Sequence, residues 1–199
     1  MRASLFPLLM CIPILALGQA VDPDEVPKEL KPFAAKNESI LAYEYADLNG
    51  DGTRDVVFIV EPKFDENDPR AREDEGIRTL KIAIRVPGGG LKVVKESRKA
   101  ALCRSCGGML GDPFESLSAG AKGFSISHYG GSSWRWMTTY SFAYSRRDNT
   151  WQLVEVEESS FHTSNPDDMK SKTYKPPRHF GKIDIVDFDP SEYRGVGKK

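Results

Sequence analysis

The sequence has few cysteines, few histidines and no excess of charge of either sign, and each shortage narrows what the protein can do. Its 28 Lys and Arg residues nearly balance 29 Asp and Glu residues, and the two signs are interspersed along the chain. Proteins that bind nucleic acids concentrate basic residues on one surface, so we expect no nucleic-acid partner. The three histidines, His128, His162 and His179, are scattered without the spacing of zinc ligands.

Long apolar runs are also lacking, except at the N-terminus. Arg2 is followed by an apolar stretch that ends at Leu17, and the small residues Gly18 and Ala20 precede an acidic segment. This order is typical of a secretory signal peptide over residues 1–20. No segment is long enough to span a membrane, and Met10 stands before Cys11 where a lipoprotein signal has a small residue. We therefore expect an exported protein, periplasmic or secreted, with residues 21–199 forming a single domain.

Short strand patterns dominate the rest of the chain, and helical patterns are rare. One short helix is expected within residues 27–35, with Leu30 and Phe33 packed on the first sheet. Alternating apolar residues between turns predict strands at residues 40–45, 56–61, 77–86, 91–94, 114–117, 123–128, 134–144 and 151–157, and a last pair at 171–174 and 182–186. Charge and proline at about residues 62–76 favour a mobile loop. The sequence therefore predicts a mainly β domain of antiparallel sheets, as a sandwich, a partly closed barrel or a fragmentary propeller.

The most informative segment is a loop between the first two predicted strands, because it places oxygen-bearing side chains at alternate positions around a glycine. Calcium prefers six to eight oxygen ligands, and this loop offers five candidates. They are Asp47, Asn49, Asp51, Thr53 (through its carbonyl) and Asp55. An EF-hand needs a glutamate at the twelfth position, which is Phe58 here, so that motif is excluded. The alternative is an ordinary acidic turn, since tight turns favour Asp, Asn and Gly.

A loop of this kind, with its last carboxylate at the ninth position and strands on both sides, resembles the calcium loops of FG-GAP and VCBS-type repeats. Only one copy is present, so the resemblance covers one hairpin and does not imply a complete propeller. It implies calcium as a bound cofactor at this hairpin.

Two cysteines remain after export, Cys103 and Cys106, in the order Cys-Arg-Ser-Cys-Gly-Gly. In an oxidising compartment two close thiols pair, so we predict a structural disulfide. Two alternatives stay open. A thiol-disulfide redox protein would begin a helix at this motif, although the glycines and Pro113 that follow disfavour one. A zinc site would need two more ligands.

A second unusual segment is rich in aromatic residues and glycine. Its candidate ligand surface comprises His128, Tyr129, Trp134, Arg135 and Trp136, which would suit a sugar or a peptide. The alternative is that Trp134 and Trp136 share one strand face and belong to the core. Together with the acidic loop, the Cys-x-x-Cys-Gly-Gly, Gly-Asp-Pro-Phe and His-Tyr-Gly-Gly-Ser-x-Trp-Arg-Trp motifs resemble those of a group of exported bacterial proteins of uncharacterised activity. The resemblance implies export and architecture and no catalytic residue.

The leading hypothesis from the sequence is an exported calcium-binding module that binds a cell-envelope glycan or protein. The alternative is an envelope enzyme, either a Cys103/Cys106 redox protein or a hydrolase. For a hydrolase, Ser132 or Ser133 would act with His128 and Asp112, but the Gly-x-Ser-x-Gly motif is absent. We therefore predict no catalytic residue.

Overall fold

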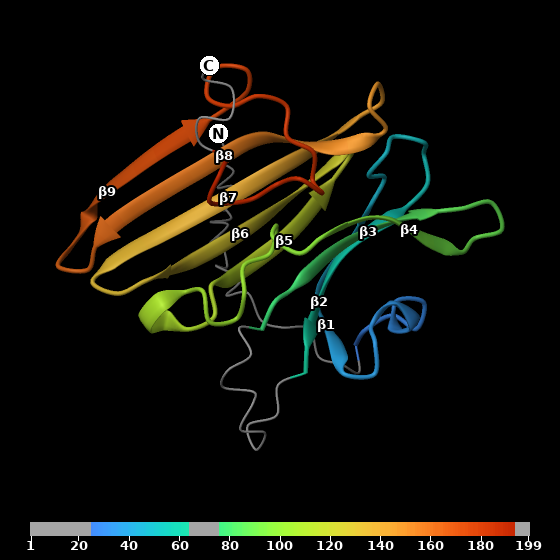
Figure 1. Ribbon diagram of the computed structural model, residues 1–199, viewed down its shortest axis with the longest axis horizontal. Helices are drawn as coiled ribbons and strands as arrows, with labels where there is room; N and C mark the ends of the chain where they lie inside the picture. Colours follow the sequence, from blue (N-terminus) through green and yellow to red (C-terminus); the bar gives the residue numbers. More distant parts are fainter. Residues whose placement is uncertain (1–24, 64–75, 194–199) are drawn as a thin grey trace, which may run out of the picture.

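The computed structural model describes residues 25–63 and 76–193, which form two antiparallel sheets (Figure 1). In each sheet the strands are hydrogen-bonded in the order in which they occur along the chain. The first sheet contains β1 (Glu38–Ala46), β2 (Asp55–Pro62), β3 (Thr79–Arg85) and β4 (Leu91–Ser97). The second contains β5 (Phe114–Gly120), β6 (Gly123–Gly131), β7 (Trp134–Ser145), β8 (Thr150–His162) and β9 (Asn165–Tyr174). The prediction of a mainly β, antiparallel fold is confirmed, and neither sheet closes into a barrel within the described residues.

The N-terminal helix is shorter than the sequence predicts. It is a single 3-10 turn, η1 (Lys31–Phe33). The expected packing is nevertheless present, because Leu30 is fully buried and the Phe33 ring lies 5.7 Å from the ring of Phe58. This segment covers one face of the first sheet, where it forms a small apolar cluster with Val56, Phe58 and Val60.

The main core lies between the other face of the first sheet and one face of the second. Strand β2 is buried on both sides, so Val57 and Ile59 contribute to this core while their neighbours in sequence face the N-terminal segment. The segment of residues 180–193, red in Figure 1, crosses the second sheet and adds Phe180, Ile185 and Phe188. We call the face of the second sheet that contributes to this core its inner face.

Two of the predicted C-terminal strands differ from the observed ones. Strand β9 begins at Asn165 rather than at residue 171, and it pairs with β8 instead of with residues 182–186. Residues 182–186 make only an isolated bridge between Asp184 and Gln152. The sequence obscured this arrangement because the first half of β9 is polar and contains Pro166, a composition that a two-sided exposed edge strand tolerates.

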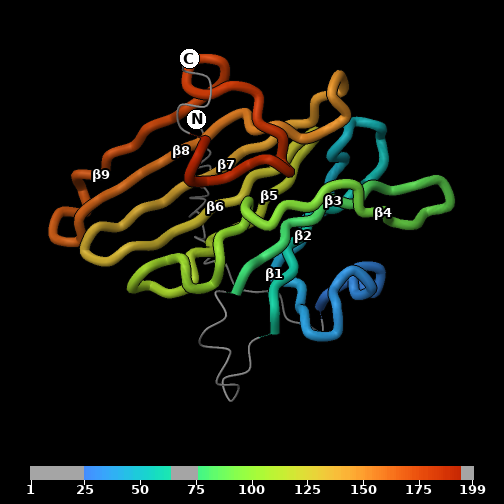
Figure 2. The backbone as a smooth tube through the Cα atoms, viewed as in Figure 1, coloured from blue at the N-terminus to red at the C-terminus, as the bar shows by residue number. Residues whose placement is uncertain are grey.

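The second sheet extends beyond the core that covers it. Figure 2 shows β6 to β9 extending away from the first sheet. Along β7, the inner-face side chains become more exposed in the part that extends beyond the core. Tyr140 and Phe142 are buried, Trp136 and Thr138 are half-buried, and Trp134 is 61% exposed. We call these two parts the covered half and the open half of the inner face.

The predicted signal peptide and most of the predicted mobile loop at about residues 62–76 lie outside the described residues. Among the residues that the structure does describe, no helix has the length and apolar character needed to cross a membrane.

Candidate functional site

A groove of about 420 Å³ lies on the open half of the inner face. Its walls come from three adjacent strands, β7, β8 and β9. The lining residues are Trp136, Thr138, Glu158, Ser159, Ser160, Lys170 and Lys172. The strand register explains this grouping, because Trp136 pairs with Ser160 and Ser160 pairs with Lys170, while Thr138 pairs with Glu158 and Glu158 with Lys172. Residues paired across a sheet point to the same side, so two rows of side chains converge on the groove.

The Trp136 indole lies against the backbone of the neighbouring strand. Trp136 pairs with Gly130 on β6, and a Cβ atom at position 130 would approach the indole Cζ2 to 2.4 Å. The same Cβ would lie 2.9 Å from the carbonyl oxygen of Gly107. This oxygen accepts a hydrogen bond from the amide of Gly131. Only glycine fits at position 130, and the absence of a side chain there allows the indole to approach the backbone of β6 closely.

The charged residues of the groove are Glu158, Lys170 and Lys172. The hydroxyl of Tyr193 donates a short hydrogen bond to Glu158 and so ties this carboxylate to the segment that crosses the sheet. Lys170 and Lys172 are exposed, and neither forms an ion pair with another of the described residues. The groove therefore combines one aromatic ring, three hydroxyl side chains, two of them on the inner face, one carboxylate and two cationic groups.

The five residues that the sequence suggested as one ligand surface lie on two faces. Trp134 and Trp136 are on the inner face, as is His128, which pairs with Thr138. Tyr129 and Arg135 alternate with them and therefore lie on the opposite, outer face, where Tyr129 pairs with Met137. The interpretation of Trp134 and Trp136 as core is also wrong for Trp134, which is 61% exposed and packs its ring edge against His162. Sequence reasoning missed the residues of β8 and β9, because these polar segments resemble loops.

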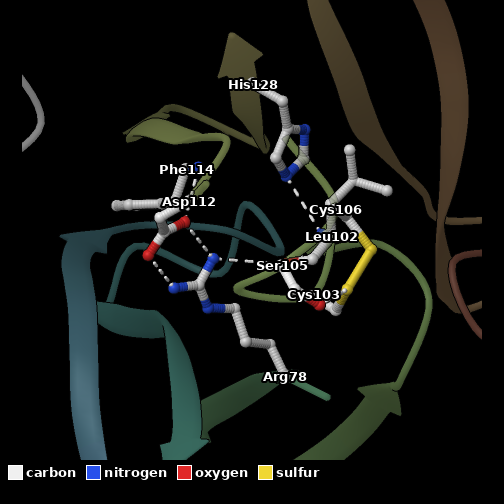
Figure 3. The surroundings of a disulfide bond; sticks show 8 residues. All are labelled: Arg78, Leu102, Cys103, Ser105, Cys106, Asp112, Phe114 and His128. Carbon is white, nitrogen blue, oxygen red and sulfur yellow. Dashed lines mark hydrogen bonds and ion pairs between the residues drawn. A yellow bond between two sulfur atoms is a disulfide. The ribbon is translucent and has the colours of Figure 1, made fainter. Parts of the chain in front are cut away.

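His128 is fully buried and is not part of an exposed surface. Its Nε2 accepts a hydrogen bond of 3.1 Å from the amide of Leu102, so the ring proton resides on Nδ1, which has no partner among the described residues (Figure 3). Burial is the main cause that lowers the pKa of His128 to about 3, and the positive charge of Arg78 acts in the same direction. The imidazole is therefore neutral at physiological pH and acts as a packed acceptor.

A buried guanidinium connects the two sheets next to His128. Arg78 is fully buried and donates to both Asp112 oxygens, at 2.7 and 2.5 Å (Figure 3). It also donates to Glu61, at 2.9 and 3.0 Å. It also donates to the Leu102 carbonyl oxygen and lies over the ring of Phe114. Burial alone would raise the pKa of Asp112, but the hydrogen bonds from Arg78 and from the Phe114 amide outweigh it and lower the pKa. The Gly-Asp-Pro-Phe motif thus serves to hold Arg78.

The pairing of Asp112 with Arg78 also bears on the triad of Ser132 or Ser133 with His128 and Asp112. Asp112 binds Arg78, and His128 accepts from a backbone amide through the nitrogen that faces Leu102. The two residues therefore do not orient each other as the members of a catalytic triad must.

The predicted disulfide is confirmed: Cys103 and Cys106 are bonded, with their Cα atoms 5.1 Å apart. The bond closes a turn that is followed by a 3-10 turn, η3 (Gly108–Leu110), and not by the helix that a thiol-disulfide oxidoreductase motif begins. The zinc alternative also lacks support, since no three His, Cys, Asp or Glu side chains converge on one point within residues 25–63 and 76–193.

The acidic loop is an ordered turn held by its own side chains. Asp47 accepts hydrogen bonds from the amides of Gly50, Asp51 and Gly52, and Asp51 accepts from the amide and the hydroxyl of Thr53. The side-chain amide of Asn49 donates to the Asp51 carboxylate, and the Asn49 side-chain oxygen accepts from the Asp51 backbone amide. The oxygen donors suit a hard cation, but the three carboxylates of this loop do not form a cluster in the described chain.

Asp55 departs furthest from the predicted role. It is fully buried, and its two oxygens accept from the amides of Leu48 and Arg85. Burial raises the pKa of Asp55, and these two amides act in the opposite direction. Asp55 therefore links the loop to β3. The loop also reaches the second sheet, where the indole Nε1 of Trp151 donates to the Leu48 carbonyl oxygen at 2.9 Å.

Comparisons with protein-family models, with curated proteins and with solved structures find no match to this chain.

Proposed function

We propose that the protein is an exported binding module that holds a cell-envelope glycan in the groove on the open half of the second sheet. The observation that supports this function is the position of Trp136, which lines a groove on a sheet face that the core leaves uncovered. An indole presents a large apolar area with a polar edge, which matches the apolar face and hydroxyl rim of a sugar ring.

The rest of the groove suits a sugar better than an apolar ligand. Thr138 and Ser160 present hydroxyl groups that can both donate and accept hydrogen bonds; Ser160 lies directly opposite Trp136, and Thr138 lies in the neighbouring row. Most of the residues that line the groove are polar or charged, so a ligand with many hydroxyl groups leaves few of its polar atoms unpaired. Such a match matters because a buried polar group without a partner is costly.

Calcium belongs to this proposal as a stabilising ligand at the Asp47–Asp55 loop. The support is the donor chemistry, since Asp47, Asn49 and Asp51 place oxygen atoms on one short, ordered loop. Calcium bound there would strengthen the connection between the sheets, because the loop is attached to β3 through Asp55 and to β8 through Trp151.

The test of the glycan function is calorimetric titration of the protein with soluble oligosaccharides cut from bacterial cell-envelope glycans. Trp136→Ala should weaken binding at least tenfold, which is about 1.4 kcal/mol. Met137→Ala is the matched control, since Met137 is the adjacent residue, is 40% exposed and faces the outer side. Circular dichroism establishes that both variants are folded.

Tryptophan fluorescence adds a second readout that does not depend on removing Trp136. In a Trp134→Phe background only Trp136 and the buried Trp151 remain, so a ligand-induced shift reports on the groove. Equal binding by Trp136→Ala and the unsubstituted protein, together with an unchanged spectrum, would contradict the proposed function.

A further inference from the structure

The groove carries a net positive charge, because two lysines and one glutamate line it. Lys170 and Lys172 are two residues apart on β9, so both side chains lie on the inner face, opposite Ser160 and Glu158. Glu158 is the one acidic residue among the groove residues, and it accepts a hydrogen bond from the Tyr193 hydroxyl. The hydroxyl is neutral and leaves the charge of Glu158 in place, so two cations share the groove with one carboxylate and one positive charge remains in excess.

Nearby acidic residues do not compensate for this charge. Asp167 and Asp168 lie at the beginning of β9 and do not line the groove. Glu155, on the outer face of β8, forms an ion pair with Lys175. Within the described part of the chain, no carboxylate approaches either groove lysine within ion-pairing distance.

Lysine is also common on edge strands, where it prevents pairing with the edges of other sheets. That role requires only that the residue lie on the edge, as Lys92 does on β4, the edge strand of the first sheet. The two lysines of β9 do more, because their side chains line a cavity next to an indole and two hydroxyl groups.

We propose that the groove selects acidic saccharides, with a carboxylate or sulfate group of the ligand paired with Lys170 and Lys172 while a sugar ring lies on Trp136. This inference rests on the proposed glycan-binding function and adds the chemical class of the ligand. An ammonium group is a compact charge on a flexible stem, so it accepts either anion without demanding one fixed geometry.

The experiment compares binding of an oligouronate with binding of a neutral oligosaccharide of the same length and linkage. The unsubstituted protein should bind the oligouronate at least tenfold more tightly, and the preference should shrink as the salt concentration rises from about 0.1 M to about 1 M, where screening acts within about 3 Å. A sulfated oligosaccharide in a parallel titration distinguishes the two anions.

The variant Lys170→Gln/Lys172→Gln should lose this preference while it still binds the neutral sugar. The matched control, Lys28→Gln/Lys92→Gln, removes the same charge from two exposed lysines far from the groove and should keep the preference. Both pairs are surface substitutions, and circular dichroism verifies their folding.

Different results would contradict the acidic ligand class and the glycan-binding function. If the β9 double variant retains the preference, or the unsubstituted protein shows none, the acidic class is wrong, while a loss of neutral binding in Trp136→Ala would still support a glycan site. If no saccharide binds in a manner that depends on Trp136, both proposals are wrong. Tighter binding of an acidic peptide than of any acidic saccharide would also overturn the inference.

Discussion

The covered and open halves of the second sheet are built from the same strands and yet have different chemistry. In the covered half the inner face of β6 and β7 is apolar, with Ile126 and Phe142 fully or almost fully buried. In the open half the same face of β7 carries Thr138, Trp136 and Trp134, and β9 adds two lysines. Strand pairing continues without interruption from one half to the other, so the difference lies in what covers the face.

This contrast indicates that the open half buries fewer apolar side chains than the covered half. Backbone hydrogen bonds hold the open half together, whereas apolar burial holds the covered half, and burial is the dominant favourable term in folding. Side chains in the open half are therefore free of most packing constraints. A half-buried indole among hydroxyl and ammonium groups is a surface suited to binding rather than to stability.

The largest expected effect is the difference in stability between matched aromatic truncations in the two halves. Phe142→Ala removes a ring that is 2% exposed, stacks on Phe124 and contacts Phe188, and it should lower the free energy of unfolding by about 3–5 kcal/mol. Trp134→Ala removes a larger ring on the same face of the same strand, which is 61% exposed, and should change it by about 0.5 kcal/mol or less.

Urea unfolding of both variants and the unsubstituted protein measures this difference. A similar loss of unfolding free energy in the two variants would show that Trp134 is as tightly packed as Phe142, and the contrast between the two halves would then be wrong.

The second prediction concerns acid sensitivity, which His128 confers at the boundary between the halves. Its pKa is about 3 in the folded protein and about 6.5 when unfolded. The folded state therefore binds fewer protons over this range, so the stabilisation is fully present above about pH 6.5 and is lost as the pH falls towards about 3. The loss should approach about 1.4 kcal/mol per pH unit and amount to about 2.3 kcal/mol between about pH 6.5 and about pH 4.5, since half of the unfolded imidazoles are already protonated at about pH 6.5.

Urea unfolding across that pH range provides the measurement. His128→Gln keeps an acceptor for the Leu102 amide and should flatten the profile, whereas His162→Gln, at a half-buried position in the open half, should leave it unchanged. An equally steep profile in both variants would mean that other groups, and not His128, cause the acid sensitivity.

The third and smallest effect is that of calcium, which should change the stability of the fold and not the binding of a ligand in the open half. If the loop binds calcium with a dissociation constant of about 10⁻⁴ to 10⁻³ M, about 10 mM calcium should stabilise the fold by about 1.4–2.7 kcal/mol. Thermal unfolding with calcium and with a chelator should show this difference, and Asp51→Ala should abolish it. Affinity for a groove ligand should not change, because the loop contacts Trp151 and not the groove residues.

Asp168→Ala is the control for this experiment, since it removes an exposed carboxylate from the open half. The absence of any calcium-dependent shift would identify the loop as an acidic turn that is stabilised by its own hydrogen bonds.

The sequence was most informative where a local pattern has one structural meaning. Alternation of apolar residues located most of the strands, and the spacing of Cys103 and Cys106 predicted their disulfide. It was misleading where stability comes from the ladder of backbone hydrogen bonds, which any residue can form. The polar first half of β9 and the C-terminal part of β8 are strands for that reason, and the groove is built from them.

The sequence by itself therefore determined that this chain forms antiparallel sheets with a cross-linked turn, because strand alternation, turn residues and two cysteines three residues apart act locally. Only the tertiary structure decided which residues share a face. Trp136 and Lys170 lie far apart in the chain and meet through two registers of strand pairing, while Tyr129 and Trp136 are close in sequence and lie on opposite faces. A side chain's face depends on register and its exposure on what covers that face, and neither quantity is local.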